Sequence, residues 1–332
     1  MIRLLTILVL PYLLFSAPPI VLVHLGKYLP PYYKTAITQA KLFNPESEIY
    51  LLVESHPCRL IQKGKIDLPD YVQVINIDRI PGKEKEQAFH KMTTHFPPYW
   101  KYVFDRFFVL ERVAKEIGLN DFLHIEGDVL LYVNFDEMIP EMHSHTKGIL
   151  MGYLNEIKAG PGIMFIKDHA SIAELNQYIL DNYRVDPIEP YRWTDMSLSA
   201  VSGLVGSLPV IPPGYSDSFD LISPDGNHAS DTPSIFEGYI RYFDERCLFD
   251  PNPYGLYFDG HSPAAKIAGV PGFIDPVAVY RCQNLPLIWK RDSKGRAVPY
   301  IRFEDVDYRL ANIHLHSKKL QQYLDRIQKE AS

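Results

Sequence analysis

Two short stretches of this sequence contain the residue types that bind metal ions and phosphates. The first is FLHIEGDVLLY, residues 122–132, in which Glu126 and Asp128 flank Gly127 at the end of an apolar run. Carboxylate oxygens are the ligands that Mg²⁺ and Mn²⁺ prefer. A hairpin turn would also account for the triplet, since Gly-Asp is common in turns. The residues alone therefore allow two interpretations, a metal site and a turn.

The second stretch is NIHLHSKKL, residues 312–320. In an extended segment, His314 and His316 project to the same face. Ser317 could then cap a helix, whose N–H groups and Lys318 would meet a diphosphate while an imidazole binds its metal. Taken alone, the stretch is more typical of surface histidines beside a solvated lysine pair. The two stretches together are compatible with one metal ion and one diphosphate.

The segments before Glu126 predict that its carboxylate lies at the edge of a sheet. Residues 102–118 have apolar side chains at helical spacing, and the run 121–125 that follows reads as a buried strand. A strand that ends in carboxylates after a crossover helix is the α/β layout in which ligands bind outside the strand ends. This context favours the metal interpretation. A second acidic triplet, Asp305-Val306-Asp307, has no such helix before it.

The remaining pattern alternates between strand and helix. Apolar runs predict strands at residues 20–25, 49–53, 72–77, 148–154, 162–168 and 298–303, with a brief one at 208–211. Helices are expected at residues 32–43, 172–183 and 193–201. Residues 212–253 are rich in Pro, Gly, Ser and Asp and predict a long surface loop. We therefore expect an α/β fold with one domain, residues 19–332, after a separate N-terminal segment.

Composition excludes several classes of protein. The net charge of −6 gives no electrostatic footprint for nucleic acid. Three scattered cysteines argue against a disulfide scaffold. No Walker loop, G-x-S-x-G or H-E-x-x-H motif occurs, which weakens ATPase and hydrolase readings.

The first 18 residues need a separate interpretation. Arg3 precedes an apolar run from Leu4 to Ala17, which has the length of a signal h-region but lacks a good cleavage site. We interpret it as an uncleaved leader or a membrane-proximal anchor; a buried N-terminal element is the alternative. The expected location is membrane-associated through residues 4–17, or otherwise cytoplasmic.

On these stretches the chain resembles the GT-A fold glycosyltransferases that use nucleotide-sugar donors. Residues 20–54 look like the opening strand, helix and second strand of that fold, and FLHIEGDVLLY resembles its acidic DxD-type signature. Later segments of the same family are similar to four further stretches of this chain: GPGIMFIKD, WTDMSLSAV, FDGHSPAAKIAGV and NIHLHSKKL. The resemblance implies a Rossmann-like, mixed and mainly parallel sheet flanked by helices. It covers residues 19–325, with Glu in place of the usual first Asp.

The resemblance also implies roles for single residues. Asp128 would be the main metal ligand, and Glu126 would reach the metal through water or contact the ribose. His316 would complete the metal site, with His314 as its substitute. The remaining roles fall to Lys318 at the diphosphate, Arg106 near the donor and Asp195 beside the acceptor hydroxyl.

The implied reaction is the transfer of a sugar from a nucleoside diphosphate sugar to an acceptor hydroxyl on a glycan, lipid or protein. The cofactor would be Mn²⁺ or Mg²⁺ and the donor a UDP-sugar. Whether Asp195 acts as a base or only positions the sugar stays open, and with it the stereochemical outcome. The alternatives are an inactive carbohydrate-binding protein on the same fold and, less well supported, a sugar-nucleotide pyrophosphorylase. The latter would need a basic Gly-rich loop where HLGKYLPPYY stands.

Overall fold

A computed structural model describes residues 17–94, 98–146, 148–155, 158–184, 194–212, 215, 247–260 and 282–330. Three segments singled out in the sequence therefore lie wholly or mostly outside the described residues. They are the apolar run 4–17, most of the expected loop 212–253, and most of the stretch 258–270.

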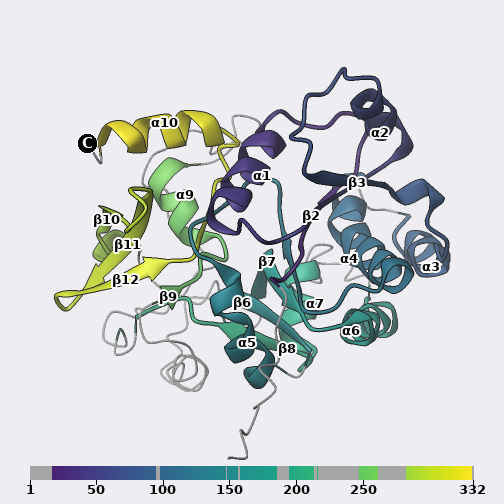
Figure 1. The fold of residues 1–332 in the computed structure, drawn as a ribbon. Helices are drawn as coiled ribbons and strands as arrows, with labels where there is room; N and C mark the ends of the chain where they lie inside the picture. Colours follow the sequence, from purple (N-terminus) through teal and green to yellow (C-terminus); the bar gives the residue numbers. More distant parts are fainter. Residues whose placement is uncertain are drawn as a thin grey trace, which may run out of the picture.

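The centre of the fold is a seven-stranded mixed sheet with the order β3-β2-β1-β4-β7-β6-β8 (Figure 1). Strands β3, β2, β1 and β4 are parallel, and β7 runs antiparallel to its neighbours β4 and β6. The predicted α/β class, with a mainly parallel sheet, is confirmed. The strands are β1 Ile20–His24, β2 Ile49–Val53, β3 Val72–Asn76, β4 Phe122–Ile125, β6 Ile149–Asn155, β7 Lys158–Ile166 and β8 Val205–Leu208.

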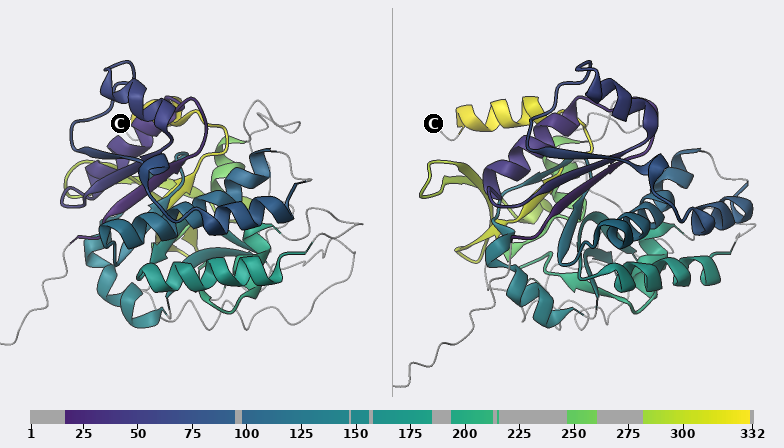
Figure 2. Two further views of the ribbon diagram at one scale, coloured as in Figure 1. Left: turned by 90° about the vertical axis from the view of Figure 1, so that its right-hand side faces the viewer. Right: turned by 45° about the vertical axis from the view of Figure 1, so that its right-hand side comes forward.

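Helices cover both faces of this sheet. Helices α4 and α6 lie side by side on one face, with α3 and α7 against α6 (Figure 2). Helix α1 packs against α10 and against the short strand β5 (Val129–Leu131) on the other side. The helices are α1 Tyr32–Phe43, α2 Ser55–Gln62, α3 Glu84–Met92, α4 Pro98–Ile117, α5 Ile139–His145, α6 His169–Asn182, α7 Asp195–Val201, α9 Pro253–Asp259 and α10 Leu320–Glu330.

The strand order produces a crevice between β1 and β4. The chain moves from β1 to β2 and β3 on one side, then returns through α4 to place β4 on the opposite side of β1. Right-handed connections leave successive helices on opposite faces at such a reversal, so a gap opens outside the carboxyl ends of the two strands. In this protein β1 ends at His24 and β4 at Ile125. The Glu126–Asp128 triplet therefore begins in this crevice.

Two smaller sheets bring the C-terminal part of the chain back to the centre. Strand β13 (Asn312–His314) pairs antiparallel with β5 (Val129–Leu131). A four-stranded sheet, β10-β11-β12-β9, lies beside them in Figure 1. Its strands are β9 Cys247–Leu248, β10 Leu287–Arg291, β11 Ala297–Phe303 and β12 Val306–Leu310. Three short 3₁₀ turns complete the described elements: η1 Ile77–Arg79, η2 Phe135–Glu137 and η3 Cys282–Asn284.

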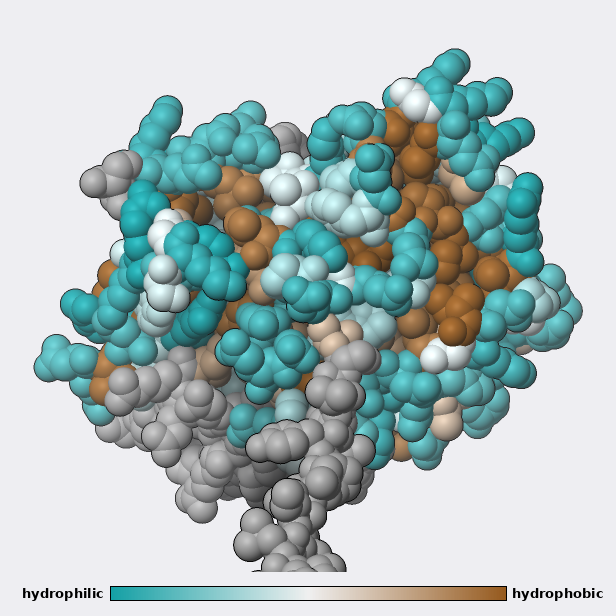
Figure 3. Space-filling model, in the orientation of Figure 1, coloured by the Kyte–Doolittle hydropathy of each residue, from teal (hydrophilic) through white to brown (hydrophobic). Residues whose placement is uncertain are grey.

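The buried core runs through the middle strands, while β3 forms one edge of the main sheet. Strands β1 and β4 are almost wholly buried, as their continuous apolar runs predict for strands covered on both faces. Strand β3 is only half-buried. Figure 3 shows apolar side chains reaching the surface on the side where β3 and α4 lie in Figure 1. Among the described residues, no helix combines the length and apolar character needed to cross a membrane.

Candidate active site

The acidic triplet forms the tight connection between β4 and β5. The amide of Val129 donates to the Glu126 carbonyl at 3.1 Å, so the segment is a turn, as the alternative interpretation stated. Gly127 lies on the ring of Tyr33, and a Cβ there would come within 2.3 Å of that ring. The Tyr33 hydroxyl is fixed by donating to the Val23 carbonyl at 2.9 Å. The turn therefore needs glycine, and it presents both carboxylates to the crevice.

Strand β13 places the histidine stretch against this turn. Its register aligns His314 with Val129, and the Leu315 amide donates to the Asp128 carbonyl at 2.8 Å. Gly162 on β7 leaves room for the imidazole, because a Cβ there would lie 2.5 Å from His314 Nδ1. The His314 and His316 rings have centroids 4.2 Å apart. The expected juxtaposition of both histidines with the acidic triplet is therefore what the structure shows.

The atoms that meet here are nearly all acceptors. His314 Nδ1 faces the Pro251 carbonyl at 3.3 Å, so it carries the hydrogen and leaves Nε2 with a lone pair in the neutral ring. Nε2 lies 3.1 Å from Glu126 Oε2 and 3.3 Å from Asp128 Oδ1. Such a convergence is stable only with a cation or proton among the atoms. A metal-binding histidine typically has this arrangement, with its other nitrogen donating to a carbonyl.

Ligand atoms of Asp128, His314 and His316 all lie within 4.8 Å of one another. Two imidazoles and a carboxylate make a mixed nitrogen and oxygen set, which suits Mn²⁺ better than the all-oxygen preference of Mg²⁺. Asp128 and His314 are buried, at 3% and 4% exposure, so little solvent competes for their atoms. The residues present therefore fit a divalent metal ion.

Lys318 occupies the other side of Asp128. Its ammonium contacts Asp128 Oδ2, and its backbone is in the left-handed region at φ 63°. Burial would raise the pKa of Asp128, but the Lys318 ammonium, together with the imidazoles of His314 and His316 when these are protonated, outweighs it and holds that pKa well below its usual value. Asp128 is therefore ionised at neutral pH. The expected cap at Ser317 is only partly right, because Ser317 accepts from the Lys319 amide at 3.2 Å and α10 begins at Leu320.

Arg106 on α4 joins two carboxylates across the crevice. It contacts Glu126 Oε1, and its other terminal nitrogen donates to Asp195 Oδ2 at 2.6 Å. Asp195 is the first residue of α7, whose cap is Thr194, and its side chain is only 3% exposed. Burial raises the pKa of Asp195, and the Arg106 guanidinium partly offsets the shift. The structure thus links three residues that the sequence named separately.

His124 and Asp250 belong to this region and were not singled out in the sequence. His124 lies on β4, wholly buried, and burial together with the nearby Arg106 guanidinium lowers its pKa to about 3. Asp250 accepts hydrogen bonds from the amides of Asn252, Tyr254, Gly255 and His314, at 2.8–3.0 Å. It therefore fixes β13 to the start of α9. Asp250 followed by Pro251 and Pro253 is a helix-start signal, but it fell within the segment interpreted as a loop.

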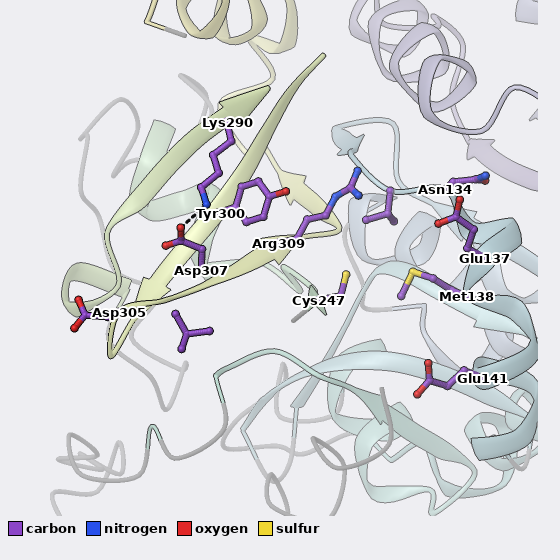
Figure 4. A pocket seen from close by; sticks show the side chains of 12 residues that line it. Asn134, Glu137, Met138, Glu141, Cys247, Lys290, Tyr300, Asp305, Asp307 and Arg309 are labelled. Carbon is purple, nitrogen blue, oxygen red and sulfur yellow. Dashed lines mark ion pairs between the residues drawn. The ribbon is translucent and has the colours of Figure 1, made fainter. Parts of the chain in front are cut away.

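A cavity of about 190 Å³ lies between β1 and α4. Its lining includes His24, Tyr33, Arg106, His124, Glu126, Asp128 and Lys318. A larger cavity, about 570 Å³, lies at the small sheet near Tyr300 and Arg309 (Figure 4). There Asp307, from the second acidic triplet, is paired with Lys290 at 2.5 Å and with Arg302 at 2.7 Å. Asp305 lies in the turn between β11 and β12, and Val306 and Asp307 begin β12.

No family model matches the sequence, and no curated protein sequence matches it. Among solved structures, the chain is similar to the PaToxG glycosyltransferase, at 14% identity over 55% of this chain and 67% of that one, with a TM-score of 0.39. It is similar to the galactosyltransferase LgtC in complex with donor and acceptor sugar analogs, at 12% identity over 62% and 80%, also at 0.39.

A third similar structure is a cytidylyltransferase from Leptospira borgpetersenii serovar Hardjo-bovis, at 12% identity over 59% of this chain and 76% of that one, with a TM-score of 0.34. Glycosyltransferases are thus among the solved structures to which the chain is similar. At TM-scores below 0.5 the likeness is partial. The functional conclusion therefore rests on the chemistry of the site.

Proposed function

We propose that this protein is a metal-dependent glycosyltransferase that moves a sugar from a nucleoside diphosphate sugar to an acceptor hydroxyl. The observation that carries the proposal is the convergence of Asp128, His314 and His316 with Lys318 in the crevice between β1 and β4. Carboxylate and imidazole ligands beside an ammonium form a set that can hold a metal ion and a diphosphate together.

In this proposal Asp128, His314 and His316 hold the metal, and Glu126 lies at its edge. The mixed ligand set favours Mn²⁺ over Mg²⁺. When bound, the metal would stabilise the negative charge that develops on the leaving diphosphate. Lys318 would then leave Asp128 and bind a phosphate oxygen, where a fixed positive charge stabilises the same developing charge.

Arg106, Glu126 and Asp195 form the sugar side of the site. Because Arg106 holds one oxygen of Asp195 and the side chain is almost wholly buried, we assign Asp195 a positioning role for the donor sugar. A UDP-sugar donor and a carbohydrate or glycoconjugate acceptor are proposed from the sequence resemblance. Membrane association through residues 4–17 is likewise a proposal from sequence, and fractionation of expressing cells tests it.

The function is tested by binding and by product analysis. The thermal midpoint is measured with Mn²⁺, Mg²⁺ or EDTA, in combination with UDP- and GDP-sugars. We expect Mn²⁺ alone to raise the midpoint, and a matching nucleotide sugar to raise it further only when the metal is present. Release of a nucleoside diphosphate in the presence of an acceptor then identifies transfer, whereas pyrophosphate exchange with a nucleoside triphosphate would identify a nucleotidyltransferase.

Two variants make the test specific to the site. Asp128→Asn removes the buried ligand and should abolish the metal-dependent stabilisation. Asp307→Asn is the matched control, because it changes an aspartate of the other acidic triplet, which is paired away from the site. Binding of free glycans with no response to metal or nucleotide would contradict the proposal and support an inactive carbohydrate-binding protein.

A further inference from the structure

His124, one of the residues that line the cavity between β1 and α4, has an unused acceptor. Its Nδ1 lies 3.0 Å from the Val21 carbonyl. A carbonyl only accepts, so Nδ1 carries the hydrogen and Nε2 of the neutral ring keeps a lone pair. The residue is 1% exposed, and within the part of the chain that the structure describes no hydrogen-bond partner reaches Nε2.

Arg106 offers an unused donor in the same cavity. Its two terminal nitrogens are taken by Glu126 and Asp195. Its Nε–H is also buried, and the described residues provide it with no hydrogen-bond partner. Both Arg106 and His124 line the cavity of about 190 Å³. Buried polar groups are almost always paired, so an unpaired donor and an unpaired acceptor on two residues that line one cavity indicate a missing ligand group.

A hydroxyl group fits this pair, because one hydroxyl can donate and accept at once. We propose that His124 Nε2 accepts from a hydroxyl of the donor sugar while Arg106 Nε–H donates to the same oxygen. This assignment rests on the proposed function and adds a specificity-determining residue to it.

The position of the pair favours the transferred sugar over the ribose. Arg106 is tied to Asp195 on α7, and α7 packs on β7, on the far side of β4 from β1, β2 and β3. The end of β1 also lines this cavity, through Val23 and His24. Because Arg106 holds Asp195, to which the proposed function gives the donor sugar, the hydroxyl between His124 and Arg106 is assigned to the sugar.

Two substitutions at His124 distinguish the effect of the Nε2 acceptor from that of the Nδ1–H hydrogen bond. His124→Asn keeps an N–H that can reach the Val21 carbonyl but removes the acceptor at the Nε2 position. His124→Gln places an acceptor near the Nε2 position instead. Affinities for free UDP or GDP, and for a panel of UDP- and GDP-sugars, are measured by calorimetry in saturating Mn²⁺, and thermal midpoints confirm that both variants fold.

We expect His124→Asn to lose about tenfold in affinity for the nucleotide sugar that the wild type binds best, the effect of one neutral hydrogen bond. Affinity for the free nucleoside diphosphate should not change, and His124→Gln should recover most of the loss. Equal losses for the sugar nucleotide and the free diphosphate would overturn the assignment to the sugar.

Two further results have distinct meanings. A lower thermal midpoint for His124→Asn without any change in affinity would overturn the inference, because the pair would then hold only a structural water. Failure of the wild type to bind any nucleotide sugar with Mn²⁺ would instead overturn the proposed function, and the inference with it.

Discussion

At the scale of single residues, the site contains more hydrogen-bond acceptors than donors, and two cationic side chains stabilise them. Glu126, Asp128 and His314 bring lone pairs to one point, and Lys318 and Arg106 provide the positive charge around it. A metal ion entering this cluster must displace the Lys318 ammonium from Asp128. Lys318 therefore competes with the metal for Asp128 and, in our proposal, strengthens the binding of the nucleotide through its phosphate.

This competition predicts opposite effects of one substitution. Lys318→Met should strengthen the binding of Mn²⁺ alone, because the ammonium no longer competes for Asp128. It should weaken the binding of UDP in saturating Mn²⁺ by about tenfold, the size of one charge-assisted hydrogen bond. Titration calorimetry measures both. Lys319→Met, which changes the exposed neighbour, is the control. Weaker Mn²⁺ binding by Lys318→Met would show instead that the ammonium orients Asp128.

A second residue-scale prediction concerns pH. In the folded protein the pKa of His124 is lowered to about 3. In the unfolded chain the same imidazole is protonated near pH 6.5. The stability that depends on neutral His124 is therefore complete above pH 6.5 and declines as pH falls toward 3, by about 1.4 kcal/mol per unit. Urea unfolding at pH 7.5, 6 and 5 should show this slope in the wild type. His124→Asn should lack that component, and parallel curves would contradict the prediction.

At the scale of elements, two connections position the site: the β4–β5 turn and the β13 strand that lies beside it. The turn is fixed by its packing on Tyr33, and β13 is fixed by Asp250, whose carboxylate accepts four backbone amides. The element carrying His314 is thus attached from both sides, to β5 by strand pairing and to α9 by Asp250.

Loss of this attachment should be detectable in both stability and metal binding. Asp250→Ala leaves four amides, three of them buried, without their acceptor and should lower the free energy of unfolding by about 3 kcal/mol or more. It should also weaken Mn²⁺ binding, because the His314 backbone loses its anchor. Asp292→Ala is a matched control, since Asp292 accepts from the amides of Lys294 and Arg296 at the β10–β11 turn. Equal effects of both variants on Mn²⁺ affinity would contradict this role for Asp250.

At the scale of the whole molecule, the site depends on contacts between residues far apart in the sequence. Asp128 and Lys318, which touch, are separated by 190 positions. The C-terminal segment completes the cluster by pairing with β5 and by placing α10 against α1. A cation held between these parts should stabilise them together.

Hydrogen–deuterium exchange tests this coupling. At Mn²⁺ one hundred times above its dissociation constant, binding to the folded state contributes about 2.7 kcal/mol. We expect slower exchange in both β5 and β13, and little change in the edge strand β3. Asp128→Asn should remove the response. Protection of only one of the two segments would mean that they do not share the ion.

The sequence by itself determined much of this molecule. Its buried strands and its amphipathic helix before Glu126 could be predicted because continuous apolar runs and helical spacing are local patterns. Local patterns also identified the acidic triplet, but they could not distinguish a metal site from a simple turn. The structure shows that the triplet is a turn whose carboxylates face the crevice. Helices α2 and α3 went unpredicted because their buried faces are small.

Only the tertiary structure decided which of the candidate groups meet. It placed His314 as well as His316 beside Asp128, joined Arg106 to Asp195, and showed Asp250 to be a buried clamp and not part of a surface loop. The pairing of β13 with β5 and the room left by Gly162 set these contacts, and neither follows from any neighbouring stretch of chain. Local sequence fixes what each side chain is able to do, whereas long-range strand pairing fixes which side chains share one site.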